Sequence, residues 1–100
     1  MLARDDGGTA VGFATVYWTW DTLGAARRGV MHDLFVAPGA RGAGVADALI
    51  EASVGECRGH GAATLVWQTA RDNTRAQSVY DRLGATRDDD WLDYSLSVRP

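Results

Sequence analysis

The stretch "VAPGARGAGVADALIEA", residues 36–52, decides how this chain folds. Pro38 ends the apolar run that precedes it, a glycine-rich turn follows, and the stretch ends in apolar residues at helical spacing. The first N–H groups of a helix have no intrahelical partner and carry partial positive charge. Glycine and alanine leave those groups accessible, which favours an anion such as phosphate. Because tight turns without a ligand also use glycine, the stretch alone leaves both interpretations open.

The same residues argue against two common nucleotide sites. Gly42 and Gly44 give a G-x-G spacing, but no third glycine stands at the offset that a dinucleotide fold requires. No acidic residue ends a following strand at the distance that such folds use. The chain contains no lysine, so a Walker-type phosphate loop is excluded as well.

The composition is typical of one small globular domain, which we expect to span residues 1–100. A net charge of -3 argues against nucleic acid as the main partner. One cysteine and two histidines form no recognisable zinc spacing, so we expect no metal. The lone cysteine suits a reducing cytoplasm, and no apolar run approaches membrane-spanning length, so we expect a cytoplasmic protein with no membrane partner. A domain this small leaves apolar surface exposed, which favours a homodimer.

Runs of β-branched and aromatic residues predict most of the chain's strands. The expected strands cover residues 1–4, 10–19, 30–37, 63–70 and 91–98, with a short strand at 85–87 as an option. The polar stretch 21–29 is expected to be a hairpin connection. The run 63–70 is continuously apolar, as expected of a strand covered on both faces.

Two helices are expected between these strands. Apolar residues at i, i+3, i+4 and i+7 predict one from Val45 to near Gly59, and a similar stripe predicts another that ends at Gly84. Asp72 or Asn73 would cap the start of the second helix. The resulting order, β-β-β-α-β-α-β, gives the fold class α/β, in the sense of a mixed α+β sheet with helices rather than a doubly wound fold.

Two motifs give this arrangement a more specific meaning. "LFVAPGARGAGVADALIEA" resembles the acyl-CoA binding motif of the GNAT superfamily of N-acyltransferases, R/Q-x-x-G-x-G/A after a strand with V-x-P. "DNTRAQSVYDRLGA" resembles that family's second motif, N-x-x-A-x-x-x-Y followed by a leucine–glycine helix end. The matching positions are Val36, Pro38, Arg41, Gly44, Ala46, Asn73, Ala76, Tyr80, Leu83 and Gly84. The resemblance covers residues 10–98 and implies a GNAT-like fold that is shortened at the N-terminus.

The resemblance implies that acetyl-CoA is the cosubstrate and lies in a cleft where the sheet splays open. Its diphosphate would sit on the backbone amides of the glycine turn, and its pantetheine arm would pair like an added strand with the strand before that turn. A backbone amide there would polarise the thioester carbonyl. Asn73 would hydrogen-bond the pantetheine arm. The implied cofactor-binding residues are Leu34, Phe35, Val36, Arg41, Gly42, Ala43, Gly44, Val45, Ala46 and Asn73.

The resemblance also implies catalytic roles for two residues. Tyr80 would be the general acid that protonates the departing thiolate; the alternative is that it only fills the apolar stripe of its helix. His32 would be the general base, directly or through water, at a place where the diamine-type acetyltransferases have glutamate. This chain is nearest to that branch in "HDLFV" and in "LGA…DDDW". Strand alternation would let only one of His32 and Asp33 face the cleft, and a histidine bonded within the sheet remains the alternative.

The implied function is an N-acetyltransferase that transfers an acetyl group from acetyl-CoA to a primary amine of a small molecule or peptide, by direct attack in a ternary complex. The usual family member has a strand and two helices before residue 10, and those helices wall the acceptor site. Their absence leaves open a truncated reading frame, a short form completed by dimerisation, or loss of catalysis. The alternative functions are a non-catalytic acyl-CoA-binding or sensing module, a subunit of a larger assembly, or a plain scaffold.

Overall fold

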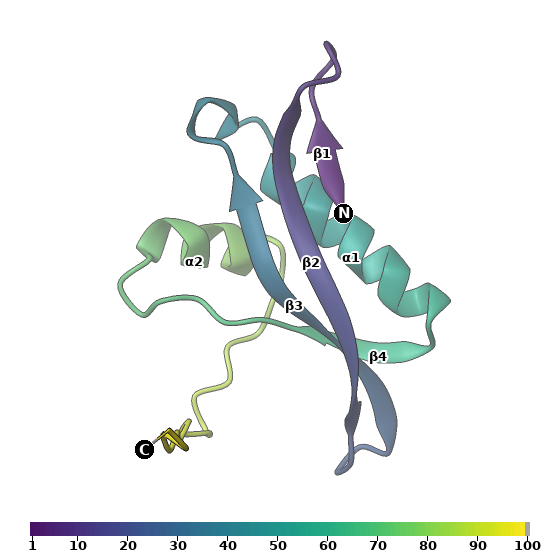
Figure 1. Cartoon of the computed structure of the whole chain (residues 1–100), viewed down its shortest axis with the longest axis vertical. Helices are drawn as coiled ribbons and strands as arrows, with labels where there is room; N and C mark the ends of the chain where they lie inside the picture. The colour runs from purple at the N-terminus through teal and green to yellow at the C-terminus, as the bar shows by residue number, and fades with distance from the viewer. Residues whose placement is uncertain (100) are drawn as a thin grey trace.

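A computed structural model of the chain describes residues 1–99. It forms one mixed four-stranded sheet in the order β1-β2-β3-β4, with two helices (Figure 1). The first three strands are antiparallel, and β4 is parallel to β3. The elements are β1 Leu2–Arg4, β2 Ala10–Asp21, β3 Ala26–Val36, a 3₁₀ turn Pro38–Ala40, α1 Val45–Gly59, β4 Ala62–Val66 and α2 Thr74–Arg82. The expected mixed α/β sheet is therefore confirmed, in the expected order as far as α2.

The hairpin between β2 and β3 is tighter than the sequence indicates. We expected a loop over residues 21–29, but β3 already begins at Ala26. The two arginines of that stretch pair with β2 across the hairpin. The Arg27 guanidinium lies 5.2 Å from the centre of the Trp20 ring, and Arg28 Nη2 lies 3.0 Å from Asp21 Oδ2. These cross-strand contacts extend the pairing of β2 and β3 into a polar segment whose composition alone predicts a loop.

The core lies between the sheet and α1. Strand alternation sends Ala14 and Met31 toward the helix, where they meet Leu49 and Ile50. Ser53 is fully buried beside them and satisfies its hydroxyl by donating to the Leu49 carbonyl at 2.8 Å. None of the helices within residues 1–99 is both long and apolar enough to span a bilayer.

Gly29 of β3 is the point where α1 approaches the sheet most closely. A Cβ at this position would lie 2.6 Å from Cys57 Sγ and 3.0 Å from Trp18 Cζ3. We therefore expect Gly29→Ala to lower the free energy of unfolding by about 1–3 kcal/mol, the usual cost of overpacking a core. Urea unfolding measures this change.

Gly55→Ala is the matched control for that substitution. Gly55 lies within α1 and has no atom within 4 Å of an added Cβ. Its replacement should stabilise the protein by up to about 1 kcal/mol, because alanine has the higher helix propensity. A second substitution, Cys57→Ala, should recover part of the Gly29→Ala loss by removing Sγ. An unchanged unfolding midpoint for Gly29→Ala would contradict this account of the packing.

β4 is shorter and less covered than expected. It ends at Val66 rather than at residue 70, and only its first and fourth residues are partly buried. The prediction of a strand covered on both faces is therefore wrong. β4 pairs only with β3 among residues 1–99, so its apolar composition does not correspond to burial on both sides.

The expected strands at 85–87 and 91–98 are also wrong. Residues 85–99 contain no regular strand, and the chain trails away from the sheet after α2 (Figure 1). The large apolar side chains of residues 91–98 are exposed, from 69% for Trp91 to 93% for Val98. The period-2 pattern of this segment is suited to a half-buried strand, but a strand forms only where a neighbour can accept its backbone hydrogen bonds.

Candidate functional site

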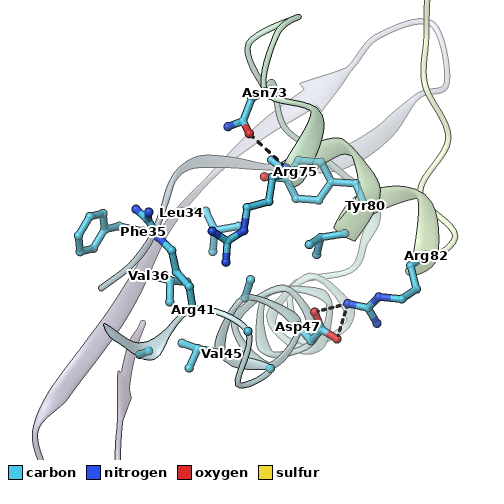
Figure 2. Close-up of a pocket in the computed structure, with 16 residues that line it drawn as sticks. Leu34, Phe35, Val36, Arg41, Val45, Asp47, Asn73, Arg75, Tyr80 and Arg82 are labelled. Atoms are coloured by element: carbon cyan, nitrogen blue, oxygen red, sulfur yellow. Dashed lines mark hydrogen bonds and ion pairs between the residues drawn. The ribbon is translucent and has the colours of Figure 1, made fainter. Parts of the chain in front are cut away.

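A cavity of about 380 Å³ opens between the end of β3, the start of α1 and one side of α2 (Figure 2). Almost all of the predicted cofactor-binding residues line it, although they come from three separate elements. They are Leu34, Phe35, Val36, Arg41, Gly42, Gly44, Val45, Ala46 and Asn73, with Tyr80 beside them. Ala43 is the one predicted residue of the glycine turn that does not line this cavity.

The glycine turn has a backbone conformation that requires glycine at two positions. Gly42 and Gly44 have φ angles of +83° and +81°, in the left-handed region that other L residues rarely adopt. Gly44 is the N-cap of α1, and no side chain caps that end of the helix. The first amides of α1, including those of Val45 and Ala46, therefore have neither an intrahelical acceptor nor a capping side chain. They are free to donate to an anion in the cavity.

The edge of β3 becomes available where the cavity begins. β4 pairs with β3 only from Arg27 to Val30. Within residues 1–99 no strand pairs with that edge of β3 at Leu34–Val36, and the two parallel strands have separated by this point. Unpaired backbone groups on a strand edge can accept an extended ligand as an added strand.

A β-bulge in β3 brings His32 and Asp33 to the same face of the sheet. Thr15 pairs with Asp33 but the next residue, Val16, pairs with Met31, so β3 carries one extra residue here. The His32 ring lies 6.0 Å from the Tyr17 ring, and Asp33 Oδ2 accepts a 2.7 Å hydrogen bond from Thr15 Oγ1. The expectation that only one of the two could face the cleft is wrong, because the bulge interrupts the alternation on which it rested.

His32 and Asp33 line a second cavity, of about 300 Å³, that adjoins the first. Its other lining residues come from β3, from the segment after β4 and from α2, namely Met31, Leu34, Trp67, Gln68, Thr69, Asn73 and Tyr80. Leu34, Asn73 and Tyr80 line both cavities. The predicted acid, Tyr80, thus stands where the two cavities meet, and the predicted base, His32, stands in the smaller one.

Tyr80 is held by an aromatic contact and is partly buried. Its ring meets that of Trp67 edge to face, with the centroids 5.3 Å apart. Partial burial removes water from the hydroxyl and raises the pKa of Tyr80 above its ordinary value. Tyr80 therefore keeps its proton at neutral pH, as a general acid must.

Asn73 begins α2 and caps it, as expected for one of the two candidate residues. Its side-chain Oδ1 accepts a 3.1 Å hydrogen bond from the amide of Ala76. The cap uses the oxygen, so the side-chain NH₂ is the group left to donate toward a ligand. At the other end of the helix Gly84 has a φ of +86°, which confirms the predicted left-handed end.

Two cations that line this cavity, Arg75 and Arg82, were not predicted from the sequence, and Arg75 is the one without an ionic partner among residues 1–99. Arg75 lies on the first turn of α2, lines the larger cavity and stands near Arg41 in the close-up (Figure 2). Neither Arg41 nor Arg75 forms an ion pair with any of residues 1–99. The signal that could have identified Arg75 is a basic residue between the asparagine and the alanine of the second motif.

We expect Arg75→Ala to weaken binding of coenzyme A about five- to tenfold, because one favourable charge would be lost near the expected position of the phosphates. Isothermal titration at two salt concentrations measures the Kd of coenzyme A, and added salt should reduce the difference in Kd between the variant and the wild type. Arg58→Ala is the control, since Arg58 lies in the last turn of α1. Equal affinities of Arg75→Ala and Arg58→Ala would remove Arg75 from the site.

Comparisons with known proteins agree with this geometry. The model of the acetyltransferase (GNAT) family matches residues 1–85. The chain is 32% identical over 98 residues to the uncharacterized N-acetyltransferase YhfO of Bacillus subtilis (strain 168). The aligned region covers 98% of this chain and 66% of YhfO. The chain thus spans slightly less than two thirds of that relative. The expected homodimer and the nearness to diamine-type enzymes stay predictions.

Solved structures show the same fold. Ribosomal-protein-alanine N-acetyltransferase from Brucella melitensis biovar Abortus 2308 superposes with a TM-score of 0.80 at 27% identity, over 96% of this chain and 67% of that one. AAC(6')-Iy, solved in complex with the bisubstrate analogue CoA-S-monomethyl-acetylneamine, superposes with a TM-score of 0.84 at 27% identity. This superposition covers 96% of this chain and 67% of AAC(6')-Iy. Both the motifs and the fold agree with the family match, and the chain is therefore a member of the GNAT acetyltransferase family.

Proposed function

We propose that this chain is an N-acetyltransferase that transfers an acetyl group from acetyl-CoA to a primary amine of a small molecule or peptide. The observation that carries the proposal is the meeting of two cavities at Tyr80 and Asn73. The larger cavity offers free helix amides and two unpaired arginines, which suit a diphosphate. The smaller one offers polar groups, which suit an amine. A donor and an acceptor bound in the two cavities would meet beside Tyr80.

On the donor side, the amides of the glycine turn and Arg41 would hold the diphosphate of acetyl-CoA. The open edge of β3 at Leu34–Val36 would pair with the pantetheine arm, and the NH₂ group of Asn73 would donate to one of its carbonyls. A β3 amide beside the thioester would stabilise the oxyanion that forms during attack. Each of these groups is placed by the backbone of β3, α1 or α2, so little rearrangement is needed on binding.

On the acceptor side, His32 would take a proton from the substrate ammonium, directly or through water, because only the neutral amine is a nucleophile. The amine nitrogen would then form a bond to the acetyl carbon while the carbon–sulfur bond breaks. Tyr80 would give its proton to the departing thiolate. The nitrogen would then release its second proton, which would return through water to the Tyr80 phenolate and restore the acid. The products would be the N-acetylated amine, coenzyme A and the proton held by His32, with no covalent enzyme intermediate.

The test combines binding with turnover. Coenzyme A is titrated calorimetrically, and release of its thiol from acetyl-CoA is followed with polyamines, amino acids and short peptides as acceptors. Binding with amine-dependent thiol release is the expected result. Binding without turnover on any amine would favour a non-catalytic acyl-CoA-binding module, an alternative supported by the chain's spanning only 66% of YhfO. Absence of binding would contradict both.

A further inference from the structure

A carboxylate lies at the end of the cavity where the diphosphate would bind. Asp47 is the third residue of α1 and lines the larger cavity together with the free amides before it. A carboxylate in the first turn stabilises a helix through its dipole. The same negative charge opposes a phosphate group bound at those amides. The site therefore contains a group whose charge conflicts with its proposed ligand.

Arg82 compensates that charge from the other helix. One of its terminal nitrogens, Nη2, lies 2.9 Å from Asp47 Oδ1 and 3.0 Å from Oδ2 (Figure 2). The hydrogen bond from Arg82 holds the pKa of Asp47 below its ordinary value, so Asp47 is ionised at neutral pH and the pair carries no net charge. Both side chains are partly exposed, so the pair contributes little to overall stability.

The pair also links α2 to α1. Other polar contacts of α2 with preceding residues go to the chain just before it, where Gln77 Nε2 donates to the carbonyls of Ala70 and Arg71 at 3.2 and 2.8 Å. Within residues 1–99 the Asp47–Arg82 pair is the only ion pair or hydrogen bond between the two helices. α1 carries the amides of the site and α2 carries Asn73 and Tyr80, so this pair joins its two halves.

We propose that Arg82 is a positioning residue for cofactor binding, which neutralises Asp47 and ties α2 to the start of α1 so that the diphosphate meets only favourable charge. This inference rests on the proposed function, because it assumes that coenzyme A occupies the larger cavity. Arg82 itself lines the larger cavity, and the proposal assigns its effect to Asp47 rather than to direct contact with the ligand. The role is not evident from either sequence motif, since the two residues lie 35 positions apart.

The experiment measures the Kd of coenzyme A for Arg82→Ala, Asp47→Asn and the double variant. Arg82→Ala leaves Asp47 unpaired and should weaken binding about tenfold. Asp47→Asn removes the opposing charge and should bind at least as tightly as wild type. The double variant should return to within about threefold of wild type, because neither charge remains. Added salt should shrink the Arg82→Ala deficit, which a purely steric effect would not do.

Arg87→Ala is the matched control. Arg87 forms a comparable exposed ion pair, with its Nη2 at 3.5 Å from Asp89 Oδ1, but it does not line the larger cavity. Its loss should leave the Kd unchanged. Wild-type affinity in Arg82→Ala would overturn the proposal, and so would a double variant as weak as Arg82→Ala, which would mean that Arg82 contacts the ligand itself. Failure of the wild type to bind coenzyme A would instead reject the proposed function, and this inference with it.

Discussion

Replacing Tyr80 with phenylalanine is expected to lower kcat by about a hundredfold or more while the Kd of coenzyme A stays within about twofold of wild type. A positioned general acid contributes about 10²- to 10⁴-fold to a rate. Phenylalanine keeps the ring, and with it the contact to Trp67 at a centroid distance of 5.3 Å. The change therefore removes the proton donor and little else. Thiol release from acetyl-CoA with an accepted amine measures the rate.

Tyr94→Phe is the matched control for this substitution. Tyr94 lies in the exposed C-terminal segment and lines neither cavity. Tyr94→Phe also removes a phenol hydroxyl, but from a residue with no proposed role, so the kcat of this variant should equal that of the wild type. An unaltered kcat in Tyr80→Phe, with the melting temperature also unaltered, would assign Tyr80 to the apolar stripe of α2 alone.

The pH dependence of the wild type follows from the same proton. In the proposed mechanism the protonated phenol is the acid, so the rate should fall as the pH rises through the pKa of Tyr80. Partial burial raises that pKa above the ordinary 10.0, so the fall should come at a more alkaline pH than for an exposed tyrosine. Tyr80→Phe should lose this alkaline limb, which a pH profile of kcat for both proteins detects.

Gly44→Val is expected to weaken coenzyme A binding at least about a hundredfold. The φ of +81° at Gly44 is strained for a β-branched residue, and the new side chain would stand at the N-cap of α1 beside the free amides. Gly44 lines the cavity and no atom lies within 4 Å of a Cβ built there, so the new side chain would have open space at the cavity wall. Each lost charge-assisted bond to the phosphates adds to the effect. Isothermal titration measures the loss.

Control substitutions at two glycines outside the cavity distinguish backbone strain from blocking of the cavity as the cause of weaker binding. Gly8 has a similar φ of +84° and equally open surroundings, so Gly8→Val introduces the same backbone strain far from the site. Gly39 stands in the 3₁₀ turn without a positive φ, so Gly39→Val adds bulk near the site but no such strain. Both variants should bind coenzyme A as the wild type does. Comparable weakening in Gly8→Val would mean that Gly44→Val acts through general destabilisation.

Local features of this chain could be predicted from the sequence because their physics is local. Gly42 and Gly44 are needed wherever the backbone must take a positive φ, and Asn73 caps the helix that begins right after it. The apolar spacing of residues 45–52 predicts the helix, but it identifies the buried face only in part: Val45 and Leu49 pack toward the sheet, whereas Ala48 and Ala52 are exposed. The two motifs then identified all but one of the predicted cofactor-binding residues as lining the larger cavity, but not Asp47, Arg75 or Arg82, which also line it.

Strand formation and the second cavity depended on contacts between distant parts of the chain. The pattern of Trp91–Val98 suits a strand, but within residues 1–99 this segment pairs with no other strand. The bulge that turns both His32 and Asp33 to one face arises from the register with β2, which no spacing within β3 reveals.

By itself, then, the sequence determined the glycine turn, both helices, the Asn73 cap and Gly84 end of α2, and the family resemblance that the comparisons confirmed. Only the tertiary structure decided where β4 ends, that Tyr80 lies between two cavities, and that Arg82 reaches Asp47. The physical reason is the range of the forces involved. Backbone torsion and capping act within a few residues, whereas pairing register and charge compensation join residues that only the folded chain brings together.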